Sequence, residues 1–189
     1  MMRWQLDSLE RRAIDAVLQH ARAGRLPASA RTLGLDVDEY HALGKVLNIE
    51  HQHSEVSAQD ENQLPLLPQL IALLWSHWAS DLPVTRVMAG TIASACFGER
   101  HLWQDIGLSG RPEVSTLLDR HFNKLAAGNT RDLKWKRYLF LRLGESLAIS
   151  DLRPPRCVNC DEFPVCFPPQ AADGVLVIRS SHGQNSQST

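Results

Sequence analysis

The chain has 189 residues, of which 43% are hydrophobic and 22% are charged, a composition that is ordinary for one globular domain with a sizeable core. Its 20 basic and 21 acidic side chains leave a net charge of -1, which excludes any overall electrostatic attraction to nucleic acid or to an anionic membrane. The longest apolar runs fall far short of a membrane span, and the N-terminus lacks the apolar core of a signal peptide, so we expect a cytosolic protein.

Helical periodicity and capping signals predict an all-α fold, a single bundle of about six helices. The first two helices begin at capping-box patterns, Asp7 with Glu10 and Asp36 with Glu39. A third helix, with Trp78 on its apolar face, is predicted at 66–80. The other helices are predicted at 84–97, at 112–122 and at 130–149, the last capped by Asn129 or Thr130.

The predicted organisation is an N-terminal helix at 1–24, a helical body at 25–152, a cysteine-rich metal-binding loop at 153–169 and a disordered tail at 170–189. Within the body, the polar stretch 48–63 places His51 and His53 close together. Two histidines at that spacing are a weak metal signal, and we favour a solvated linker. A short strand is considered only at 174–178.

Three of the four cysteines, Cys157, Cys160 and Cys166, lie in the stretch RPPRCVNCDEFPVCFPP. Two thiols separated by two residues, with a third close behind, form a local ligand set for one metal ion or one cluster. The five prolines of this stretch exclude a regular helix or a central strand. We therefore expect a loop that a bound metal would order.

Other residues have both a structural and a functional interpretation. Cys96 falls on the inward side of the helix at 84–97, so it is either a small buried apolar residue, which we favour, or a distant fourth ligand. His101 and Asp105 either fix a histidine tautomer or close a turn, and we favour the turn.

Basic residues spread along the polar side of the helix at 130–149. They are either a solvated helix face, which we favour, or a site for an oxyanion such as molybdate or phosphate. The residues in question are Arg131, Lys134, Lys136, Arg137 and Arg142.

Three blocks of the chain, HLWQDIGL, HFNKLAAGNTRDLKWKRYLFLRLGE and CVNCDEFPVCF, resemble the NifQ family of nitrogen-fixation proteins in order and spacing over residues 93–168. The resemblance implies a mostly helical, cytosolic protein that carries an iron–sulfur or molybdenum–iron–sulfur cluster. It also implies that the protein supplies molybdenum for assembly of the nitrogenase iron–molybdenum cofactor. Its partners would be cofactor-assembly proteins and molybdate or a molybdenum–sulfur species, and it would act by ligand exchange rather than as an enzyme.

The resemblance also assigns ligands. The family's pattern Cys-x4-Cys-x2-Cys-x5-Cys puts its last three cysteines on Cys157, Cys160 and Cys166 and its first on Leu152. Another cysteine often found in the family falls on Gly144. Three thiolates suffice for the irons of a cubane with three irons and one molybdenum, whose fourth corner would take non-protein ligands, His101 or His121. Alternatively, Leu152 packs against the core and the loop is the remnant of a lost cluster site.

Two further classes of function are weaker. In a structural zinc module, the three cysteines would be completed by Cys96 or a histidine, but the second ligand couple that is usual for zinc is missing. In a thiol enzyme, Cys157 and Cys160 would form a redox pair, yet the flanking prolines disfavour the strand-to-helix context that such pairs use. No catalytic triad or phosphate-binding glycine loop rises above chance.

Overall fold

The computed structural model describes residues 5–48 and 66–167, and all regular secondary structure within these ranges is helical, as predicted. Three predicted features lie outside the described residues: a linker at 48–63 that carries His51 and His53, a strand at 174–178 and a disordered tail. No helix in the described ranges is both long and apolar enough to cross a membrane.

All six predicted helices are present as α1 (Ser8–Arg22), α2 (Val37–Leu47), α4 (Leu67–Ser76), α5 (Pro83–Ala95), α7 (Arg111–His121) and α9 (Trp135–Leu147). Short elements that were not predicted are η1 (Ala28–Arg31), α6 (Leu102–Asp105), α8 (Asn123–Ala127), η2 (Cys157–Asn159) and α10 (Phe163–Cys166).

The first two helices begin where their capping boxes predict. At α1, the Asp7 carboxylate accepts hydrogen bonds from the backbone amides of Leu9 and Glu10, both at 2.8 Å, and the Glu10 carboxylate accepts from the Asp7 amide at 2.9 Å. Asp36 and Glu39 make the same reciprocal pair at α2. These side chains satisfy amides that the first helical turn leaves without partners, which fixes both starting points.

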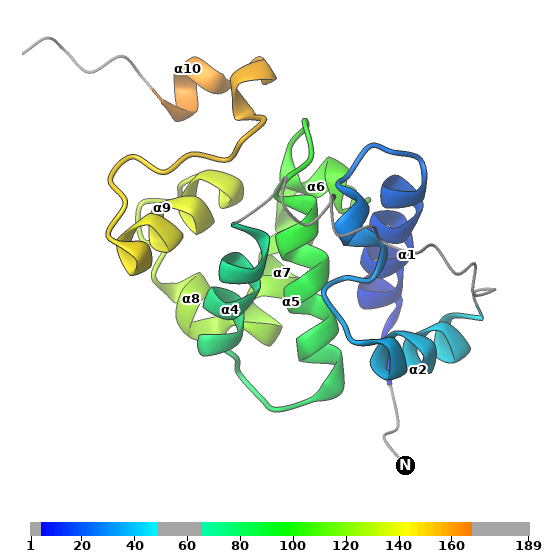
Figure 1. The fold of residues 1–189 in the computed structure, drawn as a ribbon. Helices are drawn as coiled ribbons and strands as arrows, with labels where there is room; N and C mark the ends of the chain where they lie inside the picture. Colours follow the sequence, from blue (N-terminus) through cyan, green and yellow to red (C-terminus); the bar gives the residue numbers. More distant parts are fainter. Residues whose placement is uncertain (1–4, 49–65, 168–189) are drawn as a thin grey trace, which may run out of the picture.

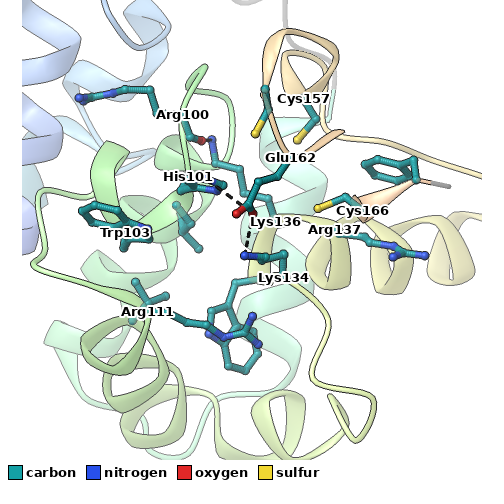
Figure 2. Close-up of a pocket in the computed structure, with 15 residues that line it drawn as sticks. Arg100, His101, Trp103, Arg111, Lys134, Lys136, Arg137, Cys157, Glu162 and Cys166 are labelled. Atoms are coloured by element: carbon teal, nitrogen blue, oxygen red, sulfur yellow. Dashed lines mark hydrogen bonds and ion pairs between the residues drawn. The ribbon is translucent and has the colours of Figure 1, made fainter. Parts of the chain in front are cut away.

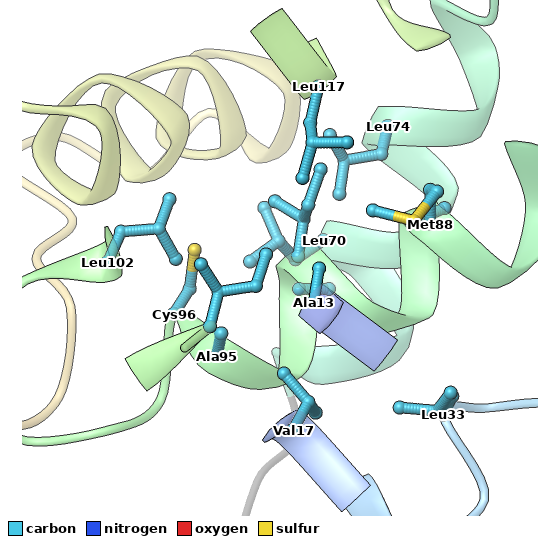
Figure 3. Packing of buried hydrophobic residues seen from close by; sticks show 14 of the residues in the cluster. Ala13, Val17, Leu33, Leu70, Leu74, Met88, Ala95, Cys96, Leu102 and Leu117 are labelled. Carbon is cyan, nitrogen blue, oxygen red and sulfur yellow. The ribbon is translucent and has the colours of Figure 1, made fainter. Parts of the chain in front are cut away.

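Helix α5 lies at the centre of the molecule, with α1 on one side and α4 and α9 on the other (Figure 1). Most of its residues are small or apolar and are buried, Arg86 being the main exception. Gly90 is required here, because a Cβ atom at this position would collide with the backbone carbonyl of Leu33. Around α5 a single apolar core joins residues from α1 to α9, and it includes Leu70, Met88 and Leu117 (Figure 3).

Two predicted helix boundaries are wrong. Helix α4 ends at Ser76 rather than at residue 80, because the Ser76 hydroxyl and the His77 ring both bond the carbonyl of Leu73 and close the last turn. Trp78 consequently lies outside the helix and is 38% exposed instead of joining the apolar face.

Helix α9 begins at Trp135 rather than near residue 130. The Asn129 side chain bonds both the amide and the carbonyl of Leu133, and Asp132 adopts a left-handed conformation with φ of 50°. Asn129 therefore closes a loop instead of capping the helix. As a result, Lys134 stands at the start of α9, at the entrance to the site described below.

The cysteine-bearing segment returns along α9 toward the start of that helix (Figure 1). A left-handed Ala148 ends α9, and residues 149–156 then lead back to η2, with Pro154 buried against the body. The prolines were predicted to exclude a regular helix running through this segment, and its described part contains only the short turns η2 and α10. Pro164 is tolerated there because it sits in the first turn, where its missing amide would have no helical partner.

Candidate metal centre

A cavity of about 240 Å³ lies between the helical body and the cysteine-bearing segment. Its walls come from residues 100–103 at the start of α6, from residues 134–137 at the start of α9, and from the segment that carries the thiols. Cys157, Cys160 and Cys166 all line it, and the side chains of Cys157 and Cys166 are shown facing it in Figure 2. The fold thus gathers the three loop-borne cysteines at one cavity rather than spreading them over the surface.

Consecutive turns, rather than a sheet, hold the thiols in place. The amide of Cys157 donates to the carbonyl of Pro154 at 3.2 Å, and the amide of Cys160 donates to the carbonyl of Cys157 at 3.0 Å. The amide of Cys166 then donates to the carbonyl of Glu162 at 3.0 Å within α10. Each cysteine amide is therefore used for local structure, which fixes the backbone and leaves the sulfur atoms to face the cavity.

The thiols are close enough to affect one another's ionisation. The pKa of Cys157 is raised to about 11, mainly by burial, against the opposing charge of Lys136, and further by Cys160 and Cys166. The pKa of Cys166 is also raised, by burial and by Cys160, while Lys134 and Arg137 lower it. Raised values mean neutral thiols at pH 7, whereas a redox-active pair needs a low thiol pKa. A metal that bound here would have to displace the thiol protons.

The three sulfur atoms do not converge on one point. Within the described ranges, no three His, Cys, Asp or Glu side chains form a group that could hold a single metal ion. A zinc ion would need such a group, with each thiolate sulfur about 2.3 Å from the metal. An iron–sulfur cluster takes one thiolate at each of several irons, so its ligands stand around a larger object. Three soft sulfur donors at one cavity are ligands of the kind that iron–sulfur clusters use.

The cavity wall opposite the thiols is cationic. Among the described residues that line the cavity, five are lysine or arginine, and Glu162 is the one acid. The N-terminus of α9 opens beside it, where unpaired amides add a partial positive charge. Such a wall stabilises an anionic occupant, and a cluster with thiolate ligands is anionic.

One of these cations, Lys136, is a structural residue. Its Nζ donates to the carbonyl of Gly98 at 2.9 Å, to the carbonyl of Arg100 at 2.6 Å and to Oδ2 of Asp105 at 2.6 Å, which uses all three of its protons. Both side chains of the Lys136–Asp105 pair are buried. The pair holds the turn at 98–105, and Gly98 must lack a side chain because a Cβ atom there would collide with the Asp105 carboxylate.

Lys134 makes a different kind of ion pair. Its Nζ lies 2.7 Å from Oε2 of Glu162, and that oxygen also lies 3.8 Å from Nε2 of His101 (Figure 2). A second contact, between Arg156 and Glu99 at 2.8 Å, also joins the cysteine-bearing segment to the body. All of these side chains are substantially exposed, so the segment is attached at the cavity mainly through solvent-accessible ion pairs.

The structure separates the additional ligand candidates. His101 lines the cavity, and its ring faces Glu162, whereas the Asp105 carboxylate pairs with Lys136 and Arg100 rather than with His101. His101 and Asp105 do close a turn, through the amide of Asp105 donating to the carbonyl of His101 at 3.0 Å. His121 lies elsewhere, buried between Oε1 of Glu10 at 3.0 Å and the Thr85 hydroxyl at 3.2 Å.

Cys96 is wholly buried at the end of α5 and packs with Leu102 and Ala95 in the core (Figure 3). Burial raises its pKa to about 12, and the smaller contributions of Lys136 and Cys157 place it close beneath the site. It does not line the cavity. The position of Cys96 is that of a small buried apolar residue.

Leu152 and Gly144, the two positions at which the resemblance leads us to expect a cysteine, lie next to each other. Leu152 is half-buried against the core, and a Cβ atom added to Gly144 would lie 3.0 Å from that of Leu152. Both residues line a separate surface depression beside the end of α9, and neither lines the thiol cavity. In this chain, the thiols at the cavity are therefore the three of the cysteine-bearing segment.

Sequence reasoning considered an anion site at the basic residues of α9 only as the less favoured alternative and did not place Arg100 or Arg111 there. The basic residues of α9 were interpreted as a solvated face, but Lys134, Lys136 and Arg137 line the cavity and Lys136 is buried. A signal was present for Lys136, because Phe140 and Leu143 follow it at i+4 and i+7, on the buried side of the helix. No local signal marks Arg111, which reaches the cavity from α7.

Within the described residues, an all-helical body and a cysteine-bearing segment enclose one cavity, at which three thiols face a wall with five basic side chains. The sequence profile of the NifQ family matches residues 13–168, well over half of the chain. The chain belongs to the NifQ family.

Individual relatives agree with this assignment. The chain is 38% identical over 98 residues to "Protein NifQ homolog" of Sinorhizobium fredii, over 52% of this chain and 43% of that protein. It is 36% identical to "Protein NifQ" of Rhodobacter capsulatus, over 51% of this chain and 53% of the relative. The "Protein NifQ" of Klebsiella pneumoniae is 27% identical over 80% of this chain and 93% of its own length. The chain thus spans about half the length of the first two relatives. No solved structure matches the chain.

Proposed function

We propose that this protein carries an iron–sulfur or molybdenum–iron–sulfur cluster on Cys157, Cys160 and Cys166 and supplies molybdenum for assembly of the nitrogenase iron–molybdenum cofactor. The observation that carries the proposal is the meeting of all three thiols at one cavity with a cationic wall. Membership of the NifQ family supports the same role. The cluster is cargo, so the protein acts by ligand exchange and not as an enzyme.

Each part of the cavity has a task in binding this cargo. Thiolates are soft ligands that suit the irons of a cluster, and the cavity presents three of them. Burial and Cys160 raise the pKa of Cys166, and the charges of Lys134 and Arg137 oppose that rise, so these two cations reduce the cost of forming the thiolate that metal binding requires. His101 has a ring nitrogen at the cavity and is the protein group placed to reach a fourth corner. His121 is buried against Glu10, away from the cavity, and is therefore not proposed as a ligand.

Release is as important as binding for a carrier. The segment that bears the thiols exposes Val158 and Val165, at 65% and 70%, and joins the body at the cavity through exposed ion pairs. Exposed pairs contribute little to stability and exchange readily with water or a partner. A cofactor-assembly protein can therefore reach the cargo at this edge without unfolding the body. Molybdenum would arrive as molybdate or as a molybdenum–sulfur species.

The test is metal and sulfide analysis, with an electronic spectrum, of protein purified without oxygen. We expect iron, sulfide and molybdenum in the wild type and their joint loss in the Cys157→Ala/Cys160→Ala/Cys166→Ala variant. Cys96→Ala is the matched control, because this thiol is buried outside the cavity and its loss should leave the metal content unchanged.

Other results would contradict the proposal in recognisable ways. Zinc alone, in a colourless protein whose zinc is lost with Cys96→Ala, would indicate a structural zinc module. No metal in the wild type would indicate a family member that has lost cluster binding, with Leu152 packed where the family places a cysteine.

A further inference from the structure

We propose that Lys134 and His101 form an anion subsite beside the thiols, occupied in this structure by the protein's own Glu162 side chain, and that a small tetrahedral oxyanion displaces Glu162 from it. The inference rests on the proposed function for the purpose of the oxyanion. It adds the residues that would bind the oxyanion and the internal group that competes with it.

The first observation is the position of the Glu162 carboxylate. One of its oxygens, Oε2, lies 2.7 Å from Nζ of Lys134 and 3.8 Å from Nε2 of His101, so it sits between two nitrogen donors (Figure 2). A carboxylate oxygen and an oxyanion oxygen make the same charge-assisted contact with such donors. Glu162 therefore occupies the place that an external anion would take.

The second observation is that the other cations of the wall differ in how they are engaged. Lys136 and Arg100 both contact Asp105, and Arg111 is paired with Asp132 and bonds the carbonyl of Leu133 at 2.9 Å. Arg137 forms no ion pair with any described residue, and its guanidinium lies 5.3 Å from the Phe167 ring. When Glu162 swings out, the wall keeps Lys134, His101 and Arg137 and loses its one acid.

The third observation is the accessibility and size of the subsite. The side chains of Lys134 and Glu162 are 44% and 41% exposed, although the contacting oxygen Oε2 is itself buried, so an external anion gains access when the Glu162 side chain rotates outward. The cavity of about 240 Å³ accommodates a small inorganic anion. Its candidate donors come from two separate elements, the start of α6 and the start of α9. Donors on different sides suit an ion with oxygens in all directions better than a planar carboxylate.

Displacement of Glu162 would also affect the thiols. Glu162 lies between Cys160 and Cys166, and its carbonyl accepts hydrogen bonds from the amides of Val165 and Cys166 in the turn that carries the last thiol. When an oxyanion takes Lys134, the segment loses one of its ion pairs with the body while the anion remains next to the thiols. Binding of the oxyanion is therefore coupled to freedom of the cysteine-bearing segment.

Titration calorimetry tests the inference in the full chain with Cys157, Cys160 and Cys166 replaced by alanine, a background without thiol chemistry at the cavity. The probes are molybdate, sulfate and malonate at constant ionic strength. We expect both inorganic oxyanions to bind one site more tightly than malonate. Glu162→Gln should tighten their binding about three- to fivefold by removing the competing charge. Lys134→Gln should weaken it about tenfold or more.

Matched controls are Glu145→Gln, a carboxylate on α9 outside the cavity, and Lys124→Gln, an exposed lysine on α8. Neither should change the affinity, and thermal melts would confirm that every variant is folded. Equal affinities in all four variants would overturn the inference, as would weaker binding in Glu162→Gln or a preference for malonate. Cluster loss and oxyanion binding are read in the same triple variant, so this inference and the proposed function can fail separately.

Discussion

Two ion pairs at the start of α9 lie two residues apart and behave as opposites. The Lys136–Asp105 pair is buried, with side-chain exposures of 6% and 5%, and every lysine proton has a partner. The Lys134–Glu162 pair has exposures of 44% and 41% and attaches the cysteine-bearing segment to the body. The first pair and the turn at 98–105 that it holds form the buried floor of the site, and the second pair lies at the surface, where the cysteine-bearing segment meets the body. Burial, rather than charge or distance, makes the difference, because both pairs are about equally short.

The largest effect is expected from Lys136→Met. This change leaves the buried Asp105 carboxylate without its lysine partner and removes the donor to two carbonyl groups, so the free energy of unfolding should fall by about 3 kcal/mol or more. Urea denaturation of the metal-free protein would measure it. Lys124→Met, on an exposed part of α8, is the control. The double variant Lys136→Met/Asp105→Asn should lose less unfolding free energy than the two single variants do together. If Lys136→Met lost no more than the Lys124→Met control, the buried pair would not stabilise the fold as described.

The second effect is a loss of stability at high pH, caused by the buried thiol of Cys96. Cys96 keeps its proton in the folded state up to about pH 12, whereas in the unfolded chain it ionises near its ordinary pKa of 9.0. Stability should therefore decrease as the pH rises above 9, by about 2–3 kcal/mol at pH 11 from this group alone. Urea denaturation at pH 8 and at pH 11 would measure the decrease in wild type and in Cys96→Ala. The same decrease in both proteins would contradict the assignment.

A smaller effect is expected from breaking the exposed pair. Lys134→Gln removes the contact with Glu162, yet exposed pairs often contribute nothing measurable, so the urea midpoint should match that of wild type. Hydrogen exchange of the amides of Cys160 and Cys166 should nevertheless become faster, because the segment is less firmly attached. A large loss of global stability in Lys134→Gln would mean that the exposed pair stabilises the fold as much as the buried pair does.

The smallest effect is expected from restoring the cysteine at the family's first position. Leu152 lines a depression that is separate from the cavity, so Leu152→Cys should leave the iron and sulfide content per chain unchanged. Anaerobic metal analysis beside wild type would test this. A gain of iron and sulfide would show that the segment rearranges to bring residue 152 to the cargo.

Local signals in the sequence were sufficient to predict the helices but not to predict the buried Lys136–Asp105 pair. Asp7 and Asp36 cap helices through side chains within three residues, so their pattern alone predicts where α1 and α2 begin. The three clustered cysteines likewise identified the segment that lines the cavity. Lys136 and Asp105 are 31 residues apart, and their pairing follows from tertiary packing, which no short pattern encodes. The same applies to Glu162, whose partners lie on two distant elements.

The length of the return segment sets how far the thiols can travel. Helix α9 has 13 residues and so extends about 20 Å, while nine residues from 148 to 156 span at most about 30 Å when stretched. The chain therefore works as a short tether whose anchor is the far end of α9. Because the stretched tether is only about 10 Å longer than α9, shortening it by about four or more residues should prevent the thiols from reaching the cavity.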